Sequence, residues 1–230
     1  MASKMKDKLK QAGVFLLRLL LLCAQVTLFF IVLYRILPVP ITPLVVMRGF
    51  PMERDWVSFD KISPKMVKAA ITAEDPKFAG HYGFDFEAIT ESIEKSIEKD
   101  KKPKGRSTIS QQTAKNLFFG PARSWVRKGL EVPITVCLEL MWTKKRIIEV
   151  YLNIIEMGDR VYGIEAAAHH YYKKPAAKLT AAESASIVVC LPLPRKRNPL
   201  KLDRKLQRKQ QTILRWMNGF EPAPDWWWGK

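Results

Sequence analysis

The segment from residue 105 to residue 131 reads GRSTISQQTAKNLFFGPARSWVRKGLE and combines hydroxyl, amide and cationic side chains behind a glycine. Thr108 followed three residues later by Gln111 is typical of a helix start, in which the two residues cap each other. Gln111, Lys115 and Phe118 then fall on one face of the helix. The composition suits binding of a phosphate-type oxyanion.

A second basic pattern follows in the same segment, where Arg123, Arg127 and Glu131 recur at steps of four. On a helix, two guanidinium groups and one carboxylate then share a face. The cations would hold Glu131 ionised, and the guanidinium groups can grip a diphosphate bidentately. The alternative is a solvated ladder of salt bridges, and the pattern alone leaves both open.

An acidic pair ends a short apolar helix upstream of this region. Ser63 and Pro64 are typical of a helix start, and the helix carries an apolar stripe toward Glu74. Residues 73–85 read AEDPKFAGHYGFD, so the carboxylates of Glu74 and Asp75 stand beside a turn.

These segments and a third one resemble the motifs of the peptidoglycan glycosyltransferases, which polymerise lipid II into glycan strands. The matching residues are Glu74, Asp75, Phe78, His81, Gly83 and Asp85 in the first block; Gly105, Ser107, Thr108, Ile109, Gln111, Gln112, Lys115 and Asn116 in the second; Arg123, Arg127, Lys128 and Glu131 in the third; and Lys144, Ile147, Glu149, Tyr151 and Asn153 in the fourth.

A fifth block, at residues 163–172, is similar to the family pattern but departs from it at its end. The family usually has Phe where Tyr172 stands and Gly where Lys173 stands. The resemblance covers residues 64–199, and the joint match of four blocks is far more specific than any single motif.

The resemblance implies a mainly α, lysozyme-like glycosyltransferase domain. It also implies an inverting hexosyltransferase for cell wall biosynthesis and cell shape, which makes β-1,4-linked strands from lipid II and releases undecaprenyl diphosphate. The serine-and-lysine acylation motif of transpeptidases is absent from the chain, so we expect the monofunctional form of the family.

The resemblance also assigns roles to site residues. Glu74 is the expected base, and Glu131 the second catalytic carboxylate, which orients the cations or helps to hold a divalent metal, Mg or Mn, on the diphosphate. No organic cofactor is expected. The expected substrate-binding residues are Asp75, Ser107, Thr108, Gln111, Gln112, Lys115, Asn116, Arg123, Arg127 and Lys128. For Thr108 and Gln111, helix capping competes with this role.

Residues 14–37 form a run of 24 mostly apolar residues, which as a helix reaches about 36 Å and can span a bilayer. The run leads directly into Pro38, so we interpret it as an uncleaved anchor. The predicted organisation is a basic cytoplasmic tail at residues 1–13, the anchor at 14–37, a linker at 38–62 and the glycosyltransferase domain at 63–230.

Lysines at positions 4, 6, 8 and 10 precede the anchor and favour a cytoplasmic amino terminus, with the domain outside the bacterial inner membrane. The net charge of +17 suits anionic headgroups or a phosphate-bearing substrate. Export, and the lack of any nucleic-acid-binding motif, exclude nucleic acid. The expected partners are lipid II, the growing lipid-linked glycan, the membrane and cell-wall synthesis proteins. Phe118, Phe119 and Trp125 are candidates for docking the lipid tail, with core packing as the alternative.

The remaining periodic segments predict helices. Asp85 is a candidate cap for a helix reaching about Lys99, and Thr143 and Thr180 are further caps, the latter paired with Glu183. Residues 200–219 also have a helical pattern, and the Trp cluster at 226–228 suits either a membrane interface or a frayed end. Short alternating patterns at residues 44–50 and 56–59 are the only strand-like features.

Cys137 and Cys190 lie in apolar runs, which favours buried thiols over a disulfide bridge. Two other functions remain open. A lysozyme-like hydrolase would share the fold and a catalytic glutamate but has no evident use for the clustered cations. A noncatalytic scaffold for cell-wall assembly would not need intact acidic and basic positions in every block.

Overall fold

The computed structural model describes residues 2–98, 107–122 and 124–219, and it divides into two compact units, Met1–Leu37 and Pro38–Lys230. Arg123, Gly105 and the Trp cluster at 226–228 lie outside the described residues. We describe each unit by itself.

The first unit is one helix, α1 (Ala2–Tyr34). Its part from Met5 to Tyr34 is the one candidate membrane span among the described residues, because it is long and strongly apolar. Large apolar side chains such as Phe15 and Leu20 are more than half exposed, as a lipid-facing helix requires. The helix fits a single-pass membrane anchor.

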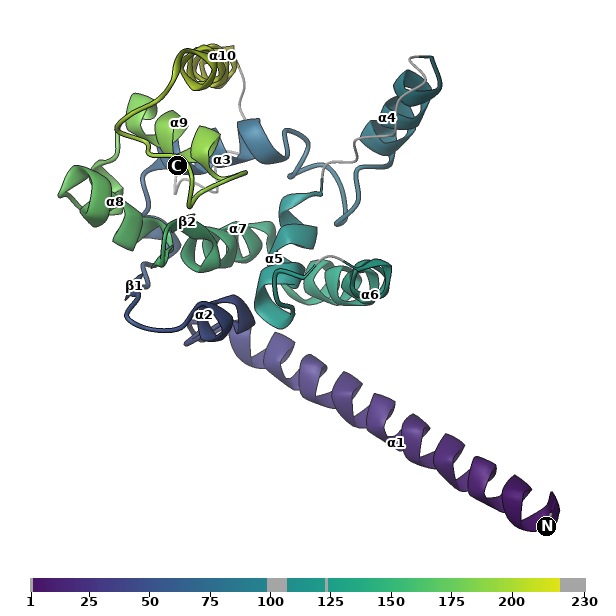
Figure 1. Ribbon diagram of the computed structural model, residues 1–230. Coiled ribbons are helices and arrows are strands. Elements are labelled where there is room, and N and C mark those ends of the chain that lie inside the picture. The colour runs from purple at the N-terminus through teal and green to yellow at the C-terminus, as the bar shows by residue number, and fades with distance from the viewer. Residues whose placement is uncertain (1, 99–106, 123, 220–230) are drawn as a thin grey trace. The chain divides into compact units, whose positions relative to one another are not determined.

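The second unit is built almost entirely from helices (Figure 1). The prediction of a mainly α fold is therefore confirmed. In chain order, the elements are α2 (Pro43–Arg48), β1 (Glu53–Arg54), η1 (Phe59–Lys61), α3 (Pro64–Glu74), α4 (Phe86–Glu98), α5 (Ile109–Phe118), α6 (Trp125–Met141), α7 (Lys144–Ile154), β2 (Glu156–Gly158), β3 (Val161–Tyr162), α8 (Ile164–Tyr172), η2 (Ala176–Lys178), α9 (Ala181–Cys190) and α10 (Arg204–Gly219).

The small sheet does not lie where the strand-like patterns are. Its order is β1-β3-β2, with β1 parallel and β2 antiparallel to β3. Residues 44–50, which alternate like a strand, mostly form α2, because Pro43 at the first turn is pre-organised for a helix. Residues 56–59 lead into the 3-10 helix η1.

The core is centred on α7, which buries seven of its eleven residues. α5 packs against both α6 and α7, while α3 packs against α9 and α10. Figure 1 shows α2 and α10 at opposite ends of this unit. α4 has no buried residue at all. The packing of α5 between α6 and α7 brings the second, third and fourth sequence blocks together.

Most of the predicted caps are present. Thr108 with Gln111, and Thr180 with Glu183, each form a complete capping box, and Thr143 caps α7. Ser63 precedes α3 as predicted, but its hydroxyl donates to the backbone oxygen of Leu179 instead of capping the helix. That bond ties the start of α3 to the segment before α9.

Candidate active site

Glu74 is the last residue of α3, and the residue after it is fixed firmly in place. Asp75 is 4% exposed, and its Oδ2 accepts a hydrogen bond of 2.9 Å from the backbone N–H of Ile109. Its Oδ1 lies 2.9 Å from Nε2 of His81. Both carboxylate oxygens therefore have protein partners, which favours a stiffening role. The end of α3 is thereby fixed to the start of α5.

The half-buried carboxylate of Glu74 contacts α5 directly. Nε2 of Gln112 donates to Oε2 of Glu74 at 3.1 Å and also to the backbone oxygen of Ser107 at 3.2 Å. Tyr151, from α7, places its hydroxyl 3.5 Å from Oε1 of Gln112. Burial raises the pKa of Tyr151 well above its usual value, and the carboxylates of Glu74 and Asp75 raise it further, so the phenol stays neutral.

A glycine turn joins these elements to α6. Gly83 has φ +84°, and a Cβ built on it would lie 2.8 Å from Cγ2 of Thr135. Only glycine suits both the positive φ and the close approach. The hydroxyl of Thr108 donates to the backbone oxygen of Gly83 at 2.7 Å, so the loop, α5 and α6 meet at one point.

The third block forms a cation cluster around a buried carboxylate on α6. Glu131 is 2% exposed, and each of its carboxylate oxygens has a cationic partner. Arg127 ion-pairs with Oε1, and the Nζ of Lys128 lies 3.0 Å from Oε2. Ser124 caps the helix by accepting from the backbone N–H of Arg127. We call Arg127, Lys128 and Glu131 the α6 cluster.

The α6 cluster and Glu74 are joined by a continuous series of polar contacts. Gln112 bonds both Glu74 and the backbone of Ser107, and the Oγ of Ser107 accepts from Nζ of Lys128 at 3.3 Å. Lys115 stands three residues after Gln112 on α5, where side chains at that spacing are about 5–6 Å apart at Cβ. A carboxylate and several cations thus line one region of the unit.

Comparison with known proteins shows the family to which the chain belongs. The family profile described as Transglycosylase matches residues 43–218, which is most of the chain and all the residues of this region. The chain belongs to the transglycosylase family.

Individual relatives agree with the family match. A Biosynthetic peptidoglycan transglycosylase of Bacteroides thetaiotaomicron is 47% identical over 201 residues, covering 84% of this chain and 81% of its own. The proteins of the same name from Caulobacter vibrioides and Escherichia coli are 48% and 45% identical, covering 80% and 88% of this chain and 81% and 88% of their own. The prediction of the family from its motifs is confirmed.

The other predicted binding residues of this transglycosylase lie along α5. Thr108 and Gln111 are engaged with each other in the capping box, so capping accounts for their hydrogen bonds. Asn116 is buried, whereas Lys115 is half-buried. Arg123, the other residue expected at the diphosphate, lies outside the described residues. The binding roles of these residues stay predictions.

The motifs did not single out Glu139 and Ser110, which form a buried ionic contact with Lys144 of the fourth block. Nζ of Lys144 lies 2.7 Å from Oε1 of Glu139, and Ser110 donates to the same oxygen. Lys144 also stands 4.5 Å from the centre of the Phe78 ring. Burial lowers the pKa of Lys144, although its contacts with Glu139 oppose that shift. The group joins α5, α6 and α7 of the transglycosylase domain. In the sequence, the position of Glu139 inside the apolar run LELMW could have indicated a buried acid with a partner.

The remaining motif residues make structural contacts in this transglycosylase. Asn153 bonds both the N–H and the C=O of Val57, at 2.9 and 2.8 Å, and Arg146 pairs with Glu149 at 3.0 Å. Lys173, where the family usually has Gly, ends α8 with φ +55° and ψ +36°. This left-handed conformation gives a physical reason for the family's glycine.

The fit of a divalent metal at Glu131 can be tested from its surroundings. Both of its oxygens already face cations, and among the described residues no group of three or more His, Cys, Asp or Glu side chains comes together. Because Mg²⁺ and Mn²⁺ prefer several oxygen ligands, one neutralised carboxylate does not suit a resident ion.

The cysteines of the transglycosylase are free thiols, as their apolar surroundings predicted. Cys23, Cys137 and Cys190 form no disulfide, and burial raises the pKa of Cys190 to about 11. A thiol with so high a pKa carries almost no thiolate near neutral pH and does not act as a nucleophile.

Proposed function

We propose that this protein is a peptidoglycan glycosyltransferase that polymerises lipid II into β-1,4-linked glycan strands and releases undecaprenyl diphosphate. The names of the relatives and the family match support this reaction class. The observation that carries the proposal is the series of contacts from Glu74 through Gln112 and Ser107 to the α6 cluster. A base and a cation cluster at one site are what the reaction needs.

In this mechanism Glu74 is the general base. Among the described residues, hydrogen bonds engage Oε2 of Glu74 and leave Oε1 for the acceptor. Oε1 takes the proton from the 4-hydroxyl of the acceptor sugar as its oxygen attacks carbon one of the donor. The bond between that carbon and the diphosphate breaks, so the configuration inverts in a single displacement.

Lys115, Arg127 and Lys128 neutralise the charge that develops on the departing diphosphate, together with Arg123, which stands two residues before the start of α6 in the sequence. Glu131 orients Arg127 and Lys128, because its buried carboxylate pairs with both side chains at once. We propose this orienting role for Glu131 in preference to metal binding. Activity that survives chelation of divalent ions is expected, whereas an absolute need for Mg²⁺ or Mn²⁺ would favour the metal role.

The exposed apolar side chains beside the α6 cluster suit the lipid portion of the substrate. Trp125 is 91% exposed and Val126 is 75% exposed at the start of α6, while Phe118 and Phe119 are half-buried. Trp125 is therefore the best of the three predicted docking residues. The lysines at positions 4, 6, 8 and 10, near the amino-terminal end of α1, support an inner-membrane protein with a cytoplasmic amino terminus and a periplasmic catalytic domain. Protease protection in spheroplasts tests that orientation.

The deciding experiment supplies the detergent-solubilised protein with labelled lipid II and resolves the products by size. A ladder of glycans is the expected result. A parallel reaction contains finished glycan strands, and their shortening without any polymer from lipid II would identify a hydrolase. No product from either substrate, by protein whose helical content is intact, would favour a noncatalytic scaffold.

A further inference from the structure

The strongest concentration of charge lies far along the chain from the motif residues. Residues 195–217 carry nine Lys and Arg residues and one acid, Asp203, so about half of the net charge of +17 falls in 23 residues. Asp203 accepts from the backbone N–H of Leu206 at 2.8 Å and caps α10. The segment itself contains no other carboxylate, and from outside it Asp159 pairs with Arg195 at 2.7 Å.

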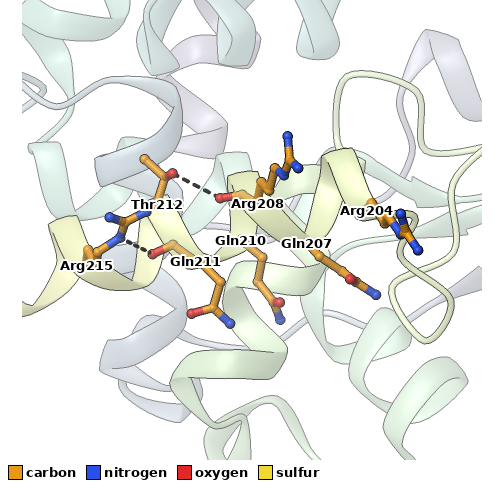
Figure 2. Close-up of a pocket in the computed structure, with 7 residues that line it drawn as sticks. All are labelled: Arg204, Gln207, Arg208, Gln210, Gln211, Thr212 and Arg215. Carbon is orange, nitrogen blue, oxygen red and sulfur yellow. Dashed lines mark hydrogen bonds between the residues drawn. The ribbon is translucent and has the colours of Figure 1, made fainter.

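Three arginines of α10 lie on its outward face, whereas Gln210 faces α9 and donates to Ser186 Oγ at 2.6 Å. Leu206, Ile213 and Met217 are buried on the inner face, against α3 and α9. Arg204, Arg208 and Arg215 stand on the opposite face at helical spacing, and all three are exposed. Figure 2 shows these side chains along the shallow groove that α10 lines, and its other lining residues are Gln207, Gln210, Gln211 and Thr212.

The guanidinium groups on this face are not committed to internal structure. Within residues 2–98, 107–122 and 124–219, none of Arg204, Arg208 and Arg215 forms an ion pair. Arg215 donates one bond, of 3.4 Å, to the backbone oxygen of Gln211 on its own helix. Gln207 and Gln211 place amides between the arginines, which adds hydrogen-bonding groups suited to hydroxyls.

We propose that the face made of Arg204, Arg208 and Arg215, the α10 face, binds the nascent glycan strand through the carboxylates of its peptide side chains. The inference rests on the proposed function, because that reaction makes the strand. Guanidinium forks match carboxylates bidentately, and the amides between them suit sugar hydroxyls. The three arginines span about 16 Å of helix, enough to meet carboxylates on more than one repeat.

A membrane surface fits the α10 face less well. A helix that lies in a bilayer interface must offer an apolar side to the lipid, whereas the apolar side of α10 is buried apart from Trp216. This observation favours a polymer over a lipid headgroup.

Binding of prepared strands tests the proposal directly. Un-cross-linked glycan strands with intact peptides are labelled and titrated with the full-length protein in neutral-lipid nanodiscs. The triple variant R204Q/R208Q/R215Q is expected to bind about tenfold more weakly, since each exposed charge pair contributes modestly. Strands stripped of peptides by an amidase are expected to bind the unaltered protein as weakly.

The chain offers a matched control on the neighbouring stripe of the same region. Lys201, Lys205 and Lys209 are also exposed, and K201Q/K205Q/K209Q removes the same charge. This variant is expected to weaken binding less than about threefold, because it leaves the arginine forks in place. Equal losses of strand affinity in the two triple variants would overturn the proposal, because they would show that strands respond only to the total positive charge of the region. Equal binding of intact and stripped strands would also overturn it.

Two further measurements separate the alternatives. Stronger binding to vesicles of anionic lipid than to strands, lost in R204Q/R208Q/R215Q, would replace the proposal with a membrane contact. The coupling of two lipid II molecules should be unchanged in that variant, whereas its products should be shorter. If the unaltered protein makes no polymer, the proposed function fails; the titration with prepared strands still decides whether the α10 face binds them.

Discussion

The α6 cluster and the α10 face each gather cationic side chains on one helix, yet their surroundings differ completely. On α6, Arg127 and Lys128 converge on Glu131, which is 2% exposed and connects them to the contacts leading to Glu74. On α10, Arg204 and Arg208 point outward with no acidic partner among the described residues. One buried carboxylate makes the difference between a fixed cation pair and an open surface.

This difference teaches how to interpret a basic helix. A carboxylate held out of water fixes its cations in one geometry, which suits a reacting diphosphate that must be met at a defined position. Exposed arginines without such a carboxylate keep their freedom and suit a long, repetitive ligand. Each of the following changes is expected to affect one region and spare the other.

The largest effect is expected from Glu74→Gln, which keeps the hydrogen bond to Gln112 but cannot accept a proton. Polymerisation of lipid II should fall by about 100-fold or more, because a positioned base contributes about 10²–10⁴ in rate. Strand binding at the α10 face should not change. Turnover is measured by the glycan ladder and folding by circular dichroism. Retained turnover would place the base elsewhere.

Glu131→Gln should have the next largest effect, because it leaves Arg127 and Lys128 without their shared charge. Misplacing the cations is expected to lower the rate by about 100-fold or less. Loss of a buried ionic partner should also reduce the free energy of unfolding by about 1–3 kcal/mol. Single-turnover rates and urea denaturation measure the two effects. Normal kinetics together with normal stability would contradict the orienting role.

Raising the salt concentration should have a smaller effect, which differs between the two regions. Raising the salt from about 0.05 M to about 0.5 M should weaken strand binding at the exposed α10 face by about tenfold, since screening acts strongly on exposed charges. The rate of the first coupling should change less than about twofold, because the α6 cluster is mostly buried. Equal salt sensitivity of strand binding and of the coupling rate would contradict the proposed difference between the exposed α10 face and the buried α6 cluster.

The smallest effect is expected at a cation in neither region. Lys173 ends α8 with φ +55°, so Lys173→Gly should relieve backbone strain and stabilise the fold by about 1 kcal/mol. That corresponds to a rise in Tm of about 2–4 °C for a unit of this size. Coupling and strand binding should match those of the unaltered protein. A fall in Tm would show that the side chain contributes more than the strain costs.

Local features of the fold could be predicted because they depend on neighbouring residues. Spacing alone predicts two helix starts, at Thr108 with Gln111 and at Thr180 with Glu183, since capping acts across three residues. The three strands of two or three residues could not be predicted, because alternation needs a longer run to be visible. Residues 44–50 show how proline at a first turn overrides an apparent strand pattern.

The candidate site divides in the same way. The motif resemblance predicted that Glu74 and the cations act together, but no spacing predicts that Gln112 and Ser107 connect them. Such contacts depend on how α3, α5 and α6 pack, which single-sequence periodicity does not contain. The pairing of Lys144 with Glu139 also escaped prediction, although an acid within an apolar run usually has a buried partner.

The bond between Asn153 and Val57 sets the order in which the second unit can assemble. The amide occupies both backbone groups of a residue 96 positions earlier. Because the chain is made from its amino-terminal end, residue 57 is present long before residue 153 has followed. The stretch after α1 therefore stays undocked until most of α7 has been made, and only then can the domain close on its own beginning.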